Sequence, residues 1–201
     1  MKLYQSPTSP YVRKVLAIAI EKGLESKIEK LPAREPGMHL DKLNPLDKIP
    51  TLVTDDGEVI IESALICQYL DELGGGGRKL YPPSGKERRR MLQLEAIGHG
   101  VLDAGVLCRM EGRFHKPEQQ SAEWLERQHK KIKRGYAMME QALGEIGGAV
   151  TPAHITFGVT IHFLERNDTY PGWRQDFPKL ATWYDAFART PCMVATDMAP
   201  A

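Results

Sequence analysis

The sequence lacks the features that mark several large classes of protein. None of its apolar runs approaches the roughly 18 residues of a membrane-spanning helix, and "MKLYQSPTSP" breaks off too early to serve as a secretory signal. The three cysteines are odd in number and form no Cys-x-x-Cys pair, and the six histidines form no metal-binding motif. We therefore expect a cytoplasmic protein that has neither a bound metal ion nor a cysteine nucleophile.

The sequence also has almost no excess of charge of one sign. Lys and Arg together number 27 and Asp and Glu 26, which leaves a formal net charge of +1. A balanced surface sets up no net field that would attract nucleic acid or an anionic membrane. We interpret the basic cluster "KERRR" at 86–90 as the solvated start of a helix, and we expect neither nucleic acid nor a membrane as a partner.

The first 80 residues alternate strand and helix patterns. The elements that we expect, in order, are a strand at 2–5, a helix that ends at Gly23, a strand at 27–31, an irregular stretch at 32–47, a hairpin around "DDGE" and a helix from Ser63. An order of this kind favours a mixed α/β sheet with helices packed on it.

The stretch "GGGGRKLYPPSG" marks the clearest boundary, because glycine and proline at this density end a helix. We interpret residues 77–85 as a flexible linker between an α/β domain at 1–76 and an all-helical domain at 86–201. Within the second domain, "ITFGVTIHFL" at 155–164 is apolar nearly all round, which predicts a helix at the centre of a bundle.

Hydroxyl side chains gather just before the first helix, in "SPTSPYV". Ser9 stands directly before Pro10, and serine is a preferred N-cap while proline is favoured at the first helical position. Helix capping would by itself account for the presence of Ser9. Two further hydroxyl residues, Ser6 and Thr8, stand close to it in the sequence.

Two further stretches place chemistry-bearing groups at the ends of strands. In "NPLDKIPTLV", Ile49-Pro50 either begins a strand, which the local residues favour, or forms a cis bond that turns its backbone toward a ligand. In "ESALICQYL", Glu62 and Ser63 stand where a strand passes into a helix. Ser63 would cap that helix, although a helix N-terminus also binds anions.

Taken together, "SPTSPYVRKV", "NPLDKIPTLV", "GEVIIESALICQYL", the Gly/Pro linker and the helical second half resemble the cytosolic glutathione S-transferase family. The resemblance covers essentially the whole chain and points to a bacterial-type member with serine at the thiol position. It implies an α/β thioredoxin-like N-terminal domain that binds glutathione and an all-α helical bundle domain that forms most of the pocket for a small electrophile. It further implies a homodimeric detoxifying transferase with glutathione as co-substrate and no resident cofactor.

The resemblance also implies a role for individual residues. Ser9 would face the glutathione sulfur as the catalytic residue, with Ser6 and Thr8 as alternatives because branches of the family place the key residue slightly differently. The backbone of Ile49, before a cis-Pro50, would pair with the cysteinyl part. Glu62 and Ser63 would hold the γ-glutamyl amine and carboxylate.

Two further assignments implied by the resemblance leave alternatives open. The glycyl carboxylate of glutathione would find its partners among Lys48, Arg34 and His39. Asp103 would reach the γ-glutamyl amine bound by a partner subunit, or would be only a solvated or intrahelical polar residue.

Two positions depart from the family pattern. Ser9 stands where a branch with glutaredoxin-like activity has cysteine, which argues against thiol–disulfide exchange. His154 replaces an acidic residue in the N-capping box of "TPAHITFGV" at 151–159, and we expect a weaker cap there.

Two functions remain open on the sequence alone. The first is transfer of glutathione to a small electrophile. The second is a transferase-like protein that binds glutathione or another partner with little turnover.

Overall fold

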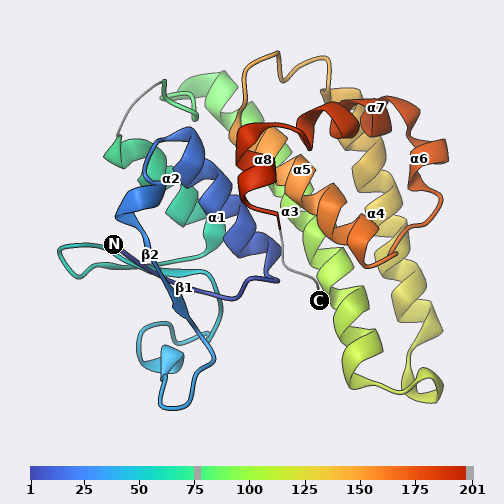
Figure 1. Ribbon diagram of the computed structural model, residues 1–201. Helices are drawn as coiled ribbons and strands as arrows, with labels where there is room; N and C mark the ends of the chain where they lie inside the picture. The colour runs from blue at the N-terminus through green and yellow to red at the C-terminus, as the bar shows by residue number, and fades with distance from the viewer. Residues whose placement is uncertain (75–77, 198–201) are drawn as a thin grey trace. The chain divides into compact units, whose positions relative to one another are not determined.

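The structure, a computed structural model, describes residues 1–74 and 78–197 and divides the chain into two compact units (Figure 1). The first unit is Met1–Tyr81 with the C-terminal segment that begins at Pro191, and the second is Pro82–Thr190. The predicted bounds of the domains are not the same as these units, because the sequence assigned the C-terminal segment to the helical half.

The first unit is built on a four-stranded mixed sheet. Its strands are β1 (Lys2–Gln5), β2 (Glu29–Pro32), β3 (Thr51–Val53) and β4 (Val59–Ile61), in the order β2-β1-β3-β4. β1 pairs with β2 in parallel, whereas the pairs β1–β3 and β3–β4 are antiparallel. The predicted mixed sheet is confirmed. β2 begins two residues later than predicted, because Glu25–Lys27 forms a 3₁₀ turn, η1.

The register of the strands brings distant segments to one edge of this sheet. Tyr4 lies opposite Thr51, which in turn lies opposite Ile61, and Gln5 lies opposite Pro32. The chain therefore leaves β1, β2 and β4, and enters β3, at the same edge. We call this the site edge.

Two helices, α1 (Pro10–Glu21) and α2 (Ser63–Leu73), pack side by side in the first unit (Figure 1). A short helix, α8 (Pro191–Ala195), packs on α1, and a 3₁₀ turn, η2 (Leu40–Lys42), interrupts the irregular stretch after β2. The core between sheet and helices is apolar, and its fully buried members include Leu3, Val15, Ile18, Leu52, Ile66 and Leu70. Burial of such side chains is the main favourable term that holds the unit together.

A buried ion pair joins the ends of the two helices. Lys22 Nζ, at the C-cap of α1, lies 3.1 Å from Asp71 Oδ1 in the last turns of α2. Burial raises the pKa of the Asp71 carboxyl, but hydrogen bonds from the backbone of Leu80 and Tyr81, together with the Lys22 ammonium, outweigh it and leave that pKa below its usual value.

The same carboxylate holds part of the predicted linker. The backbone N–H groups of Leu80 and Tyr81 donate to Asp71 at 2.8 and 3.1 Å, and both side chains are buried. The structure describes the predicted linker from Arg78 onward, and Gly77 lies outside the described residues. Residues 80 and 81 are thus bound to the end of α2.

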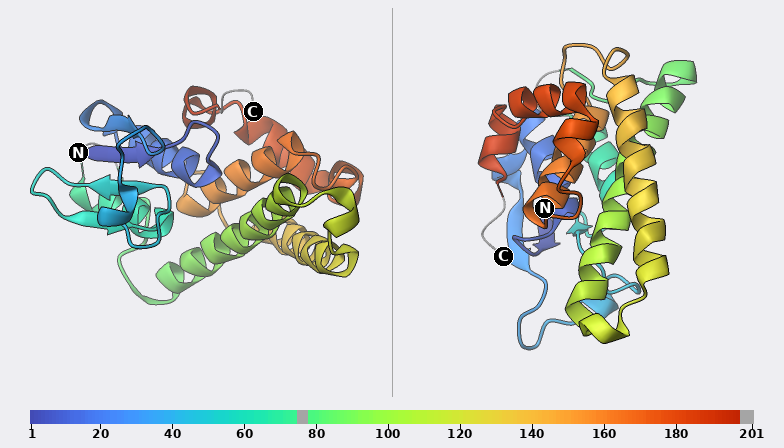
Figure 2. Two further views of the ribbon diagram at one scale, coloured as in Figure 1. Left: turned by 90° about the horizontal axis from the view of Figure 1, so that it is seen from below. Right: turned by 90° about the vertical axis from the view of Figure 1, so that its right-hand side faces the viewer.

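All the secondary structure elements in the described residues of the second unit are helical, as predicted. Its helices are α3 (Gly85–Phe114), α4 (Ala122–Ala142), α5 (Pro152–Arg166), α6 (Trp173–Asp176) and α7 (Pro178–Phe187), with a 3₁₀ turn, η3 (Pro117–Gln119), between α3 and α4. The long helices α3 and α4 run side by side, and α5, which is buried along almost its whole length, packs on α3 (Figure 2). None of the helices in the described part of the chain is long and apolar enough to cross a membrane.

The start of α5 forms a capping box that includes His154. Thr151 caps the helix through Oγ1, which accepts from the backbone N–H of His154 at 3.3 Å, and His154 Nδ1 accepts from the backbone N–H of Thr151 at 3.2 Å. A complete capping box is therefore present with His154 in the place of the acidic residue, and the expectation that it is a weaker cap stays a prediction. The ring nitrogen replaces a carboxylate oxygen here because the buried ring is fixed by its stack on Phe187, with the centroids 5.9 Å apart.

Candidate functional site

The site edge carries three of the segments that the sequence singled out. Ser9 follows β1, Ile49-Pro50 precedes β3, and Glu62 and Ser63 follow β4. The strand register places the ends of these three strands beside one another. The predicted site residues of the first unit thus come from segments that share one edge of the sheet, although they span more than fifty positions of the sequence.

Ser9 is the N-cap of α1, as expected from the residues. Its backbone is extended, and its Oγ accepts a hydrogen bond from the backbone N–H of Val12 at 3.3 Å, with Pro10 in the first turn. A hydroxyl has one donor as well as two acceptor lone pairs. Ser9 therefore caps the helix with a lone pair and keeps its own O–H for donation to another group.

A hollow of about 240 Å³ opens beside Ser9. Ser6 and Ser9 line it from the chain before α1, and residues 195–197 line it from the C-terminal segment. Thr8 is not among the lining residues, and its Oγ1 lies 3.3 Å from Ser6 Oγ. Of the three clustered hydroxyl residues, Ser9 and Ser6 are thus the two that face this hollow.

Arg13 holds the C-terminal segment against α1 beside this hollow. Its side chain is 4% exposed, and its Nη2 donates to the carbonyl of Met193 at 2.8 Å, while Nε donates to Thr196 Oγ1 at 3.4 Å. Arg13 was not predicted to be part of the site. No sequence signal could have found it, because its partners lie about 180 residues away.

The start of α2 differs from the prediction. Glu62, not Ser63, is the N-cap, and its Oε1 accepts from the backbone N–H of Ser63 at 3.1 Å. The expectation that Ser63 caps the helix was wrong, because α2 begins at Ser63 itself. Glu62 has a φ of 73°, which is uncommon for a residue with a side chain and recurs at functional sites.

The hydroxyl of Ser63 is left without a role in the fold. Ser63 is fully buried, and among the described residues its Oγ has no hydrogen-bond partner. A buried hydroxyl is ordinarily paired, since burial without a partner is unfavourable. Its place in the first turn, where backbone N–H groups and the helix dipole favour negative charge, makes it suited to an anionic group.

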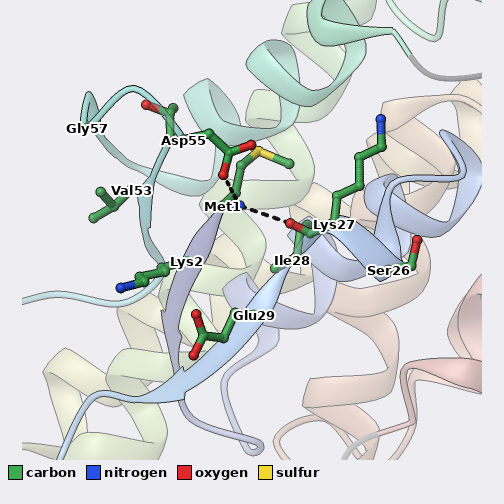
Figure 3. Close-up of a pocket in the computed structure, with 10 residues that line it drawn as sticks. Met1, Lys2, Ser26, Lys27, Ile28, Glu29, Val53, Asp55 and Gly57 are labelled. Carbon is green, nitrogen blue, oxygen red and sulfur yellow. Dashed lines mark hydrogen bonds and ion pairs between the residues drawn. The ribbon is translucent and has the colours of Figure 1, made fainter.

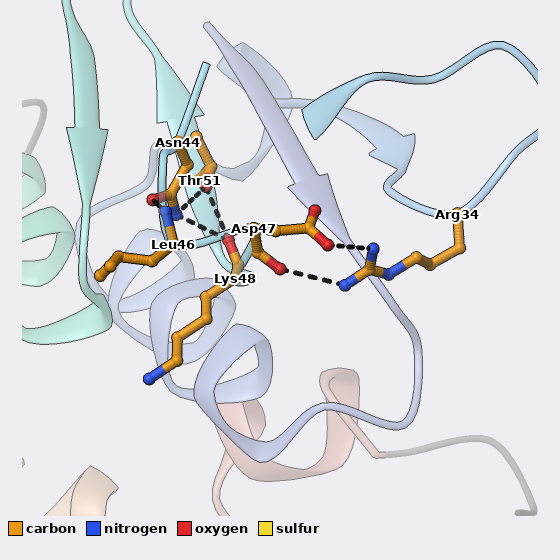
Figure 4. A network of polar contacts seen from close by, with 6 residues as sticks. All are labelled: Arg34, Asn44, Leu46, Asp47, Lys48 and Thr51. Carbon is orange, nitrogen blue, oxygen red and sulfur yellow. Dashed lines mark hydrogen bonds and ion pairs between the residues drawn. The ribbon is translucent and has the colours of Figure 1, made fainter. Parts of the chain in front are cut away.

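The loop before β3 is held by a network around Asn44 (Figure 4). The buried amide of Asn44 donates to the carbonyl of Lys48 at 2.9 Å and to Thr51 Oγ1 at 3.0 Å, and its oxygen accepts from the backbone N–H of Leu46 at 3.0 Å. The Ile49-Pro50 bond is cis, which is the alternative that the local residues did not favour. β3 starts directly after Pro50, so the bond also stands at the start of a strand. An Asn that bonds the N–H two residues on is a known turn signal, which could have identified Asn44.

The three candidates for the glycyl carboxylate differ in their surroundings. Arg34, two residues after β2, pairs with Asp47, the distance from Nη1 to Oδ2 being 2.7 Å. The Lys48 amine points away from that pair in Figure 4, and its side chain is exposed. His39 is exposed at the start of η2 and makes no side-chain cap bond there.

A second, larger hollow of about 500 Å³ lies at the opposite edge of the sheet (Figure 3). It is lined by exposed charged residues that include Lys2 and Glu29, and the amino group of Met1 there contacts Asp55 Oδ1 at 2.6 Å. None of the predicted site residues lines it. Asp103 lies in α3 of the second unit, where its side chain is exposed.

The described residues hold no group of three or more His, Cys, Asp or Glu side chains that could bind a metal ion. Cys67 and Cys192 are buried. Burial raises the pKa of the Cys108 thiol, against smaller opposing effects of a backbone hydrogen bond and of Lys131. A raised pKa keeps a thiol protonated, and the thiolate is the nucleophilic form.

Comparison with known proteins decides the family. The family model for the N-terminal domain of glutathione S-transferases matches residues 8–73, and the model for the C-terminal domain matches residues 122–186. This chain belongs to the glutathione S-transferase family. The first match contains every predicted site residue of the first unit.

Similar proteins agree with this membership. The GST-like protein YibF of Escherichia coli, which is itself called uncharacterized, is 33% identical, with 94% of this chain and 98% of YibF covered. A glutathione transferase family member from Pseudomonas fluorescens Pf-5 with bound glutathione is 35% identical, with 99% of each chain covered and a TM-score of 0.92. A second structure of a glutathione transferase family member from Pseudomonas fluorescens Pf-5 contains bound S-(propanoic acid)-glutathione. It is 35% identical to this chain, with 100% of each chain covered and a TM-score of 0.89.

Proposed function

We propose that this glutathione S-transferase family member is an active transferase, which binds glutathione at the site edge as the thiolate and transfers it to a small electrophile. The observation that carries the proposal is the fully buried, unpartnered hydroxyl of Ser63 at the start of α2, on the same sheet edge as Ser9. A similar protein with glutathione bound supports the choice of thiol.

Ser9 is the residue that we expect at the sulfur. A free thiol has a pKa near 8.5, so little thiolate exists at pH 7. A hydrogen bond to a charged acceptor contributes about 1.5–3 kcal/mol, and one pKa unit corresponds to about 1.4 kcal/mol. One such bond from Ser9 would therefore lower the thiol pKa by about 1–2 units, which makes thiolate a major species at neutral pH. The start of α1 acts in the same direction.

Glu62 and Ser63 would hold the γ-glutamyl end of glutathione. The Ser63 hydroxyl and the free N–H groups of the first turn of α2 would bind the carboxylate. One oxygen of Glu62 is used by the helix cap, and a carboxylate has a second oxygen with which to accept from the γ-glutamyl amine.

The loop at 44–51 would hold the remainder of the tripeptide. The backbone of Ile49, before Pro50, would pair with the cysteinyl part, as it does in the family pattern. Lys48 is our first choice for the glycyl carboxylate, with Arg34 and His39 as the other candidates.

The reaction itself would need no group other than these. The sulfur of the bound thiolate forms a bond to the electrophilic carbon, a leaving group such as halide departs with the electron pair of the bond that breaks, and the thiol proton passes to solvent. Ser9 acts as a hydrogen-bond donor throughout and is not consumed. Binding of an S-substituted glutathione by a similar protein fits a site of this kind.

Two measurements on the purified protein test the proposal. Calorimetry with glutathione should show binding, and 1-chloro-2,4-dinitrobenzene or an organic hydroperoxide should be turned over. Binding without turnover of either compound would favour the second function, a glutathione-binding protein with little activity. The absence of glutathione binding would rule out the transferase and the glutathione-binding protein, and would leave only a transferase-like protein that interacts with another partner.

We also propose a homodimer in which Asp103 reaches the γ-glutamyl amine bound by the partner. Closed two-fold symmetry is the commonest form of oligomer. A ligand shared between subunits would strengthen the dimer by mass action. Sedimentation with and without glutathione tests the assembly: a monomer at micromolar concentration would contradict it. A dimer in which Asp103→Asn leaves glutathione affinity unchanged would contradict only the shared site.

A further inference from the structure

We infer that Arg34 and Asp47 form a positioning pair, which fixes Lys48 for the glycyl carboxylate and so sets the preference of the site for glutathione over thiols in which that carboxylate is masked. The inference rests on the proposed function. It assigns Arg34 a role through Asp47 in place of a direct contact with the ligand.

The contact between Arg34 and Asp47 is made at two points. Arg34 Nη1 donates to Asp47 Oδ2 at 2.7 Å, and Nη2 donates to the backbone carbonyl of Asp47 at 3.0 Å (Figure 4). Paired guanidinium contacts of this kind fix orientation as well as distance. Arg34 thus holds both the side chain and the backbone of the residue that precedes Lys48.

The backbone at Asp47 has a conformation that is uncommon for a residue with a side chain. Its φ is 48°, in the left-handed region that Asp and Asn adopt more readily than most residues other than glycine, and its N–H donates to the carbonyl of Asn44 at 2.8 Å. On the other side, the carbonyl of Lys48 accepts from Asn44 and from Thr51 Oγ1, the latter at 2.8 Å. The backbone of Lys48 is therefore held from both directions.

Charge distinguishes the roles of the two cations. Arg34 is paired with the Asp47 carboxylate at 2.7 Å, whereas the Lys48 amine points away from the pair (Figure 4). The glycyl carboxylate of glutathione would therefore be attracted more strongly to Lys48 than to Arg34, whose charge is already paired. An exposed ion pair contributes little to stability. Its value here would be geometric, because it holds the backbone from which the Lys48 side chain extends.

The test compares two ligands that differ only at the glycyl end: glutathione and its glycyl monoethyl ester. Calorimetry on the full chain should show that the wild type prefers glutathione. Arg34→Met and Asp47→Asn should each reduce that preference by about three- to fivefold, as expected for loss of an exposed pair. Affinity for the ester should not change. Asn tolerates the left-handed conformation, so Asp47→Asn removes the ion pair without forcing a new backbone.

Three further variants make the test specific. The double variant Arg34→Met/Asp47→Asn should lose no more than either single variant, because the two residues act as one unit. Arg34→Lys, which keeps the charge but not the two-point contact, should lose part of the preference. Lys42→Met, which removes one positive charge from exposed η2 in the same stretch, should behave as the wild type. Thermal unfolding of each variant shows that the fold is intact.

The outcomes that overturn the inference are distinct from failure of the proposed function. If Arg34 binds the carboxylate directly, Asp47→Asn will keep or increase the preference for glutathione while Arg34→Met lowers it. Unchanged preference in both variants also overturns the inference, as does a wild type that binds the two ligands equally. Only a wild type that binds neither ligand would overturn the proposed function as well.

Discussion

The starts of α1 and α2 carry the same residue type at the same place in the sequence pattern, yet the two serines do different things. Ser9 caps α1 with its oxygen, whereas Ser63 lies inside the first turn of α2 with its hydroxyl buried and unpartnered. Glu62 caps α2 instead. A serine at a helix start is therefore not evidence of a cap until the residue before it has been considered.

The ends of the same two helices differ from their starts, because there the helices depend on each other. Lys22 and Asp71 form a buried ion pair that also binds the chain at Leu80 and Tyr81. The starts of the helices carry the residues that we propose for glutathione, while the ends are committed to the fold. This contrast predicts that changes at the ends affect stability and changes at the starts affect function.

The largest expected effect is on stability, at the helix ends. Asp71→Asn leaves the Lys22 charge buried without its partner and should lower the free energy of unfolding by about 3–5 kcal/mol, measured by urea denaturation. The double variant Lys22→Met/Asp71→Leu removes both charges and should recover part of this loss. A loss below about 0.5 kcal/mol in Asp71→Asn would contradict the contrast between starts and ends.

The same carboxyl gives a pH dependence with a definite sign. The pKa of Asp71 is lowered in the folded protein from its ordinary value of 3.8. As the pH falls, the Asp71 carboxylate therefore becomes protonated at a higher pH in the unfolded chain than in the folded protein. The contribution of Asp71 to stability is therefore full above pH 3.8 and is lost as the pH falls below that value toward the folded pKa. Asp71→Asn should remove this part of the acid sensitivity.

The second effect is on reactivity, at the start of α1. Ser9→Ala should raise the pKa of the bound glutathione thiol by about 1–2 units and lower turnover at pH 7 by about 8- to 25-fold, with a far smaller change in affinity. Ultraviolet absorbance of the thiolate, followed through a pH titration, measures the pKa. If it stays constant, Ser9 does not act on the sulfur, and Ser6, which lines the same hollow, is the next candidate.

The third effect is on affinity, at the start of α2. Ser63→Ala should weaken glutathione binding by about tenfold or more through loss of a charge-assisted hydrogen bond, as measured by calorimetry. Glu62→Gln keeps an acceptor for the helix cap and removes only the charge, so it should weaken binding without a loss of stability. Near-wild-type affinity in both variants would leave these two residues with a purely structural role.

The smallest effect separates the two serines by stability alone. Ser9→Ala removes a helix cap and should cost about 1 kcal/mol. Ser63→Ala removes a hydroxyl that has no partner in the fold and should be neutral or slightly stabilising. Thermal unfolding of the two variants, without ligand, measures the difference. A cost at Ser63 equal to that at Ser9 would show that its hydroxyl is paired within the protein.

Much of the architecture followed from local patterns. The order of strands and helices in residues 1–73, the helical second half and the cap at Ser9 were predicted, because each depends on residues that are neighbours in the sequence. The roles at the start of α2 and α5 were not. Glu62 caps α2 in place of Ser63, and His154 completes the capping box of α5 in place of the acidic residue of the family pattern.

The sequence by itself determined which segments form strands and helices and which family motifs they carry, because periodicity, turn residues and helix caps act over a few positions. Only the tertiary structure decided what those segments do to one another. The strand register brings the chain after β1, β2 and β4 to one edge, Arg34 meets Asp47 across thirteen residues, and Arg13 meets the carbonyl of Met193 across 180. Such contacts depend on how the sheet pairs and on what the core buries, and neither is encoded in any single short stretch.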